Sequence, residues 1–252
     1  VAPAPPAIID GGIATAGLLA TIVTAKFEDA MPLYRQEKQF ARFGVELSRK
    51  TMADWMIAAA TACAPLMAML ERQLRAGPIL RVDETPLQVL GEEGRADTTK
   101  SFMWVARGGT PGCEVLFYRY DTSRGADAAR RLIGDFQGFL QTDGYEVYDL
   151  VCKERPQLDH VGCMAHVRRD FADAKKNSRK AGSADEALAM IGKLYAVEQR
   201  REDHPDPEEF VSWRKEQVAP VLEKFHAWLE RKQAQVPPTL LLGQAVGYAL
   251  GQ

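Results

Sequence analysis

The sequence has few cysteines, no long apolar run and no large excess of either charge, and each lack removes a class of protein. Four cysteines in 252 residues do not form the disulfide framework of a small secreted domain. No apolar run approaches the roughly 20 residues that a membrane-spanning helix needs. The apolar stretch 12–27 lacks the basic start and cleavage site of a signal peptide. We therefore expect a cytoplasmic protein with no membrane partner.

The sequence also lacks a phosphate-binding P-loop and the pattern of a serine or cysteine nucleophile, so ATP dependence is not implied. The formal net charge of −2 does not by itself indicate a nucleic-acid-binding protein. It conceals one basic segment, 168–180, in which six basic residues outnumber two acids. The basic residues are Arg168, Arg169, Lys175, Lys176, Arg179 and Lys180. This segment is either a track for phosphates or a solvated helix face with pairs such as Arg169 with Asp173.

Hydrophobic periodicity divides the chain into four parts. We expect a linker over 1–13, a helical region resembling a helix-turn-helix over 14–77, a core of strands and helices over 78–180 and a further helical part over 181–252. The core alternates its pattern: strands at 79–83, 86–90, 101–107 and 114–120, a helix at 123–136, a strand at 138–143, a helix at 145–154, a strand at 158–163 and a helix from 164. This order predicts an α/β protein whose sheet has one antiparallel section and crossover helices.

Two aspartates follow apolar strand patterns. Asp83 ends the run ILRVD, and Asp143 ends GFLQTD. If these strands are neighbours, both carboxylates face one crevice, and oxygen ligands of this kind suit Mg²⁺ or Mn²⁺. The alternative is structural, because aspartate at a strand end is often a turn former and Asp143 precedes Gly144.

Four motifs, VDETPLQVL, FMWVAR, GFLQTDGYEVYD and CMAHVRRDFADA, together resemble the catalytic region of the insertion sequence 66 family of transposases. The resemblance implies a ribonuclease H-like fold with a DDE metal site, in which Asp83 is the first acid and Asp143 the second. It implies Mg²⁺- or Mn²⁺-dependent hydrolysis at the ends of a bacterial insertion sequence, after which the freed 3′-hydroxyl attacks target DNA. The implied partners are element-end and target DNA and companion proteins of the same element. The amphipathic helices over 183–235 themselves look suited to contacts with further copies of the chain. The implied location is the nucleoid.

The sequence departs from the family pattern at both ends. The family's third acid, a glutamate on a late helix, would fall beyond Gln252, and no cysteine-rich zinc-binding stretch precedes the core. We therefore expect an incomplete chain that binds metal poorly and does not cut DNA alone. The alternatives are a catalytically dead DNA-binding or oligomerising remnant and a metal-dependent nuclease without strand transfer.

Further residues are candidates for contacting DNA: His166, Arg168, Arg169, Lys175, Lys176, Arg49, Lys50 and Tyr145. His166 either contacts phosphate or packs, and Tyr145 follows the second acid, where it could stack on a base. Arg49 and Lys50 begin the second helix of the helical hairpin, which resembles a helix-turn-helix. His160, Cys163 and His166 provide only half of a convincing zinc ligand set.

Overall fold

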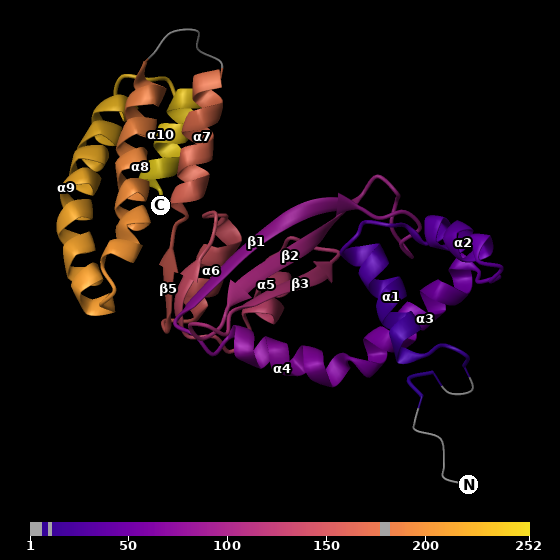
Figure 1. The fold of residues 1–252 in the computed structure, drawn as a ribbon. Helices are drawn as coiled ribbons and strands as arrows, with labels where there is room; N and C mark the ends of the chain where they lie inside the picture. Colours follow the sequence, from indigo (N-terminus) through magenta and orange to yellow (C-terminus); the bar gives the residue numbers. More distant parts are fainter. Residues whose placement is uncertain (1–6, 10–11, 177–181) are drawn as a thin grey trace. The chain divides into compact units, whose positions relative to one another are not determined.

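The computed structural model describes residues 7–9, 12–176 and 182–252, and it divides into two compact units, 1–72 and 73–252 (Figure 1). The domain boundaries expected from the sequence stay predictions, and the expected linker 1–13 lies partly outside the described residues. Among those residues no single helix is long and apolar enough to cross a membrane, although one bent helix pair, Arg49–Ala62 with Ala64–Leu74, passes by length and composition.

The first unit is a helical hairpin with an additional helix. Its helices are α1 (Ala16–Phe27), α2 (Leu33–Arg42) and α3 (Arg49–Ala62), and α4 (Ala64–Leu74) runs across the boundary of the units. Ser48 caps α3 as its position predicts, because its hydroxyl accepts a hydrogen bond from the N–H of Thr51 at 3.0 Å. Ile22 of α1 and Met52 and Trp55 of α3 form the centre of a small apolar core. The sequence predicts one helix over 48–76, but the structure bends it by 55° between α3 and α4.

The second unit contains a five-stranded mixed sheet in the order β3-β2-β1-β4-β5. The strands are β1 (Ile79–Gln88), β2 (Lys100–Gly108), β3 (Val115–Asp121), β4 (Gly138–Gln141) and β5 (Leu158–Val161). β1 to β3 form an antiparallel meander, whereas β4 pairs in parallel with β1 and with β5. This mixed α/β sheet confirms the predicted fold class and is consistent with a ribonuclease H-like fold.

Strand β1 is continuous, whereas the sequence predicts a break after Asp83. Pro86 lies inside the strand, opposite Phe102 of β2. The pairing between β1 and β4 ends at Arg81, so beyond that point β1 has the character of an edge strand, where proline is tolerated. The longer strand carries Asp83 in its interior.

The two faces of the sheet differ in burial because side chains alternate along each strand. Leu80 and Val82 of β1 and Trp104 of β2 are buried on one face. The helices α5 (Ala126–Ile133) and α6 (Glu146–Glu154) lie behind this face in Figure 1. Asp83 belongs to the opposite, exposed face.

The last four helices form a bundle: α7 (Met164–Lys176), α8 (Ser183–Gln199), α9 (Pro207–Gln233) and α10 (Leu241–Leu250), with a 3₁₀ turn at Arg200–Asp203 (Figure 1). Each helix packs against two others, in the cycle α7, α8, α9, α10. Phe171 and Ile191 are fully buried in its core, where Phe225 and Trp228 stack on each other. The amphipathic patterns of the sequence thus bury their apolar sides in one shared core.

Candidate metal centre

The parallel pairing of β1 with β4 places the two predicted acids at the same level of the sheet. Leu80 pairs with Leu140 and Arg81 with Gln141, after which β4 ends. The same register continued by two residues sets Asp83 beside Asp143, which lies in the loop directly after β4. The sequence predicts Asp83 at the end of a strand, but the structure places it inside β1. The neighbouring strand β4 ends at this level and leaves that side of β1 open.

The carboxylate of Asp83 is half exposed, with 54% of its side chain accessible. Its Oδ1 accepts a hydrogen bond from the N–H of Glu84 at 2.8 Å, and its Oδ2 lies 3.9 Å from Nε2 of His166. These two side chains line a small cavity of about 180 Å³ together with Thr142 and Cys163. Nδ1 of His166 is buried and has no hydrogen-bond partner among the described residues. The structure therefore brings the predicted His166 to the first acid.

Asp143 is held by contacts from three directions. Its Oδ1 accepts from the N–H of Tyr145 at 3.0 Å, and its Oδ2 lies 3.6 Å from Nη2 of Arg124. Its backbone carbonyl accepts a hydrogen bond from the hydroxyl of Tyr248 in α10, at 2.5 Å. Gly144 follows with a φ of 75°, in the left-handed region that glycine enters without a penalty. The loop of the second acid is thus fixed by the bundle as well as by the sheet.

A buried carboxylate lies directly under this pair. The side chain of Glu84 is fully inaccessible; its Oε1 lies 2.5 Å from Nε of Arg124, and its Oε2 accepts from the hydroxyl of Tyr148 at 2.5 Å. Burial raises the pKa of Glu84, and the hydrogen bonds from Tyr148 and Arg124 only partly oppose that rise. Burial and the charge of Glu84 raise the pKa of Tyr148, so its phenol remains a neutral donor.

Arg124 joins this buried network to the second acid. Its guanidinium contacts Glu84 and Asp143 and lies 3.9 Å above the ring of Tyr145. Sequence reasoning missed the roles of Arg124 and Glu84, whereas it expected Tyr148 to pack under the loop of the second acid, and Tyr148 is fully buried. Strand alternation could have found Glu84, because neighbours in a strand face opposite sides and Asp83 faces outward. Nothing in the sequence around Arg124 indicated its partner.

The cations predicted along α7 have acidic neighbours. Lys175 pairs with Asp185 at 2.6 Å, and Lys176 with Asp173 at 2.7 Å. Arg169 lies 3.9 Å from Asp170, and Arg168 is exposed on the same helix. Arg179 and Lys180 lie outside the described residues. A role of this segment in binding DNA stays a prediction.

The cations predicted at the start of α3 lie in the first unit. Lys50 forms an ion pair with Asp54 at 2.8 Å, and this hydrogen bond raises its pKa. The backbone N–H of Arg49 donates to Glu37 of α2, while the side chain of Arg49 is exposed. DNA contact by these two residues also stays a prediction.

The half zinc set is not completed in the part of the chain that the structure describes. His160 directs Nε2 to the hydroxyl of Thr142 at 2.8 Å and Nδ1 to the carboxylate of Asp149 at 3.0 Å, so both ring nitrogens are engaged. Among the described residues no group of three or more His, Cys, Asp and Glu side chains could hold a metal ion. Carboxylates such as those of Asp83 and Asp143 offer the oxygen chemistry that Mg²⁺ and Mn²⁺ prefer, and their role as metal ligands stays a prediction.

A mixed sheet with an acid on the central strand, level with a second acid after the neighbouring parallel strand, is consistent with the ribonuclease H-like class of proteins. The model of the Transposase IS66 family matches residues 11–252, and the chain belongs to that family. The chain is 33% identical to uncharacterized protein y4qI of Sinorhizobium fredii (strain NBRC 101917 / NGR234) over 98% of its own length and 47% of the relative. It is 32% identical to uncharacterized protein y4jD of the same strain, over 99% of its own length and 50% of the relative. The chain thus spans about half the length of the curated relatives it matches.

Proposed function

We propose that this chain carries the first two acids of a DDE transposase site, which acts on phosphodiester bonds of DNA with a divalent cation. The observation that carries the proposal is the register of β1 and β4, which sets Asp83 level with Asp143. Family membership supports a role in transposition. Hydrolysis at the element ends and strand transfer into target DNA are proposed for the whole protein, with nucleoid DNA and further copies of the chain as partners.

Asp83 and Asp143 would hold the cation. Mg²⁺ in proteins commonly binds one or two carboxylates and completes its shell with water and substrate phosphate. When bound, such an ion activates water and stabilises the leaving oxygen of a phosphodiester. Two carboxylates are a small donor set, so we propose weak binding in the absence of DNA or of a further ligand. For the same reason we propose that these 252 residues alone do not cut DNA.

Arg124 is proposed to position the second acid. Its guanidinium is held by the buried Glu84 and reaches Asp143, so it ties the loop after β4 to the central strand. It also places a positive charge between the carboxylates of Glu84 and Asp143. His166, close to Asp83 and with Nδ1 unpartnered, is proposed to contact the phosphate of bound DNA.

Binding of Mn²⁺ to the chain, followed by electron paramagnetic resonance, tests this site without requiring activity. We expect weak binding by the wild type and at least a tenfold loss in both Asp83→Asn and Asp143→Asn. Asp159→Asn is the matched control, because Asp159 is an exposed strand aspartate on β5. Binding that survives both substitutions, or falls equally in the control, would refute the shared site.

The variant Arg124→Gln distinguishes two roles of Arg124: holding the loop of Asp143 in place, or repelling the bound cation through its charge. If Arg124 holds the loop, the glutamine variant should bind Mn²⁺ more weakly, whereas Arg124→Lys, which keeps the charge, should recover part of the affinity. If the arginine only repels the cation, the glutamine variant should bind more tightly, and the positioning role is wrong.

Single-turnover incubation of the chain with an end-sequence duplex and Mg²⁺ tests the need for a further ligand. We expect no cleavage, and robust cutting would show that the two acids suffice.

A further inference from the structure

Helix α2 carries a cationic face that neither the acid pair nor the motifs explain. Arg35, Lys38 and Arg42 are spaced by three and four residues, which places them along one side of the helix. All three are exposed. Arg35 hydrogen-bonds the hydroxyl of Tyr34 at 3.1 Å, and among the described residues neither Lys38 nor Arg42 has an ion pair with a carboxylate. Their charges are therefore available to an external anion.

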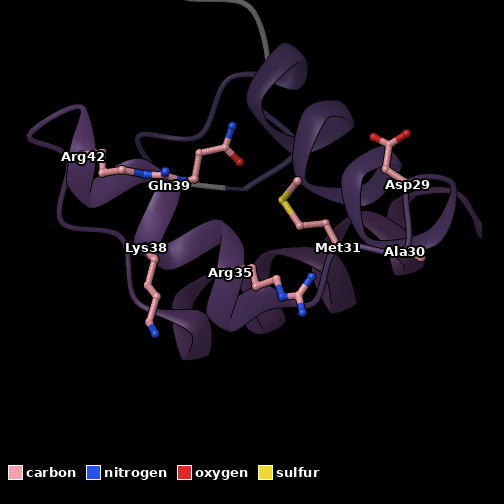
Figure 2. A pocket seen from close by; sticks show the side chains of 7 residues that line it. All are labelled: Asp29, Ala30, Met31, Arg35, Lys38, Gln39 and Arg42. Atoms are coloured by element: carbon pink, nitrogen blue, oxygen red, sulfur yellow. The ribbon is translucent and has the colours of Figure 1, made fainter.

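These three cations line an open cavity of about 610 Å³ against the turn between α1 and α2 (Figure 2). One acid, Asp29, belongs to the same lining. Figure 2 shows the carboxylate of Asp29 directed away from the charged ends of Arg35 and Lys38. Three positive charges against one negative charge make this cavity complementary to a polyanion.

The wall of the cavity is held in place from inside the unit. Gln36, only 2% exposed, donates from Nε2 to the carbonyl oxygens of Ile22 at 3.3 Å and Met31 at 3.0 Å. Ala30 in the turn has a φ of 52°, a left-handed conformation that costs a non-glycine residue about 1 kcal/mol. Such strain persists only where the surrounding structure imposes it, and it concentrates at functional sites. The cations thus extend from a helix whose orientation to the turn is fixed.

The start of α3 has less unpaired positive charge than α2. Lys50 there is neutralised by Asp54 at 2.8 Å, and Glu37 faces the first turn of α3 through its bond to the N–H of Arg49. In the first unit the unpaired cations therefore concentrate on α2, among the residues that the structure describes.

We propose that Arg35, Lys38 and Arg42 bind the phosphate backbone of double-stranded DNA. The separation of seven positions between Arg35 and Arg42 corresponds to about 10 Å of helix. One DNA strand presents a charge about every 3.4 Å along the duplex axis, so this span can face successive phosphates. Contacts of this kind position a protein on DNA without reading its sequence. The choice of DNA as the polyanion rests on the proposed function, but the site lies in the first unit and needs no metal.

The test measures duplex binding by the whole chain in EDTA, by fluorescence anisotropy, over salt from about 50 to 200 mM. Each lost phosphate contact should flatten the slope of log affinity against log salt by about 0.9, so the triple change to glutamine should flatten it by about 2.7. Over that salt range the three contacts together account for about a 40-fold change in affinity. The matched control, Lys215→Gln with Lys224→Gln and Arg231→Gln, removes the same charge from exposed positions on α9 and should leave the slope unchanged.

Circular dichroism checks that the variants fold, and Arg35→Lys with Arg42→Lys, which keeps the charge, should retain the wild-type slope. An unchanged slope in the triple glutamine variant would overturn the proposal, as would equal flattening in the control or no duplex binding by the wild type at the lowest salt. The same variants are also tested for binding to vesicles of anionic phospholipid. If the triple glutamine variant loses binding to these vesicles but not to duplex DNA, the cationic face belongs to a membrane contact and the proposal is overturned. Because no metal is present, failure here is distinct from failure of Asp83 and Asp143 to bind Mn²⁺.

Discussion

The hydrogen bond from Tyr148 to Glu84 predicts a pH-dependent loss of stability in Tyr148→Phe. Both side chains are buried, and the phenol donates to Oε2 at 2.5 Å. A hydrogen bond to a charged group contributes about 1.5–3 kcal/mol, and its loss here leaves a buried carboxylate oxygen without this donor. We expect the variant to lose about 2–3 kcal/mol of unfolding free energy near neutral pH.

The direction of the pH effect follows from the raised pKa of Glu84. Because burial raises that pKa in the folded state, ionisation of Glu84 lowers stability as the pH rises through the folded pKa. Tyr148 opposes this, since its hydrogen bond lowers the pKa of Glu84. Below the ordinary pKa of a glutamate the carboxyl is protonated in both states, and the lost bond is a neutral one contributing about 1 kcal/mol. The variant should therefore lose less stability in mild acid than at neutral pH.

Urea unfolding near neutral pH and in mild acid measures the stability that Tyr148→Phe loses at each pH. The unfolding transition of the second unit is fitted separately. Tyr118→Phe is the control, because Tyr118 is 57% exposed on the open side of β3 and should change stability by less than about 0.5 kcal/mol. A Tyr148→Phe cost below about 0.5 kcal/mol at neutral pH, or a larger cost in acid, would refute the stabilising role of the hydrogen bond from Tyr148 to Glu84.

Two further substitutions test the two units separately. Ala30→Gly should stabilise the first unit by about 0.5–1 kcal/mol in thermal or urea unfolding, because glycine relieves the left-handed backbone; destabilisation would show that this turn is unstrained. Ile191→Ala should cost the second unit about 2–5 kcal/mol, because the side chain is fully buried in the bundle core. Val211→Ala, at a 62% exposed position on α9, should stay within about 0.5 kcal/mol, and equal losses in both would contradict the assigned core.

The sequence predicts the sheet well because its strands are short, apolar and punctuated by turn residues. It fails at Pro86, where proline suggests a break. The break is absent because β4 ends early and leaves β1 with a partner on one side only, which is a property of the pairing and not of the local sequence. The bend between α3 and α4 is different, because the sequence does mark it: Pro65, in the first turn of α4, cannot donate a hydrogen bond to the carbonyl of Thr61 in α3. The prediction of one helix over 48–76 passed over this proline.

In the candidate site, too, residues marked by the local sequence were predicted, and residues whose roles depend on distant contacts were not. Asp83 and Asp143 stand out because each follows an apolar strand pattern, and their common level then follows from one parallel register. The bonds of Arg124 and Tyr148 to Glu84 could not be predicted from sequence, because they join residues 40 and 64 positions apart in the chain. The free cations of α2 are likewise visible only once the partner of Lys50 is known.

The contact between Tyr248 and the carbonyl of Asp143 has a consequence for the order of folding. The strands and the loop of the second acid leave the ribosome well before α10, and the two bonded residues are 105 positions apart. Contacts between such distant segments form late, since the intervening chain must first be ordered. Nascent chains that have completed the sheet still lack this anchor, so the loop acquires its final restraint only when the helical bundle closes.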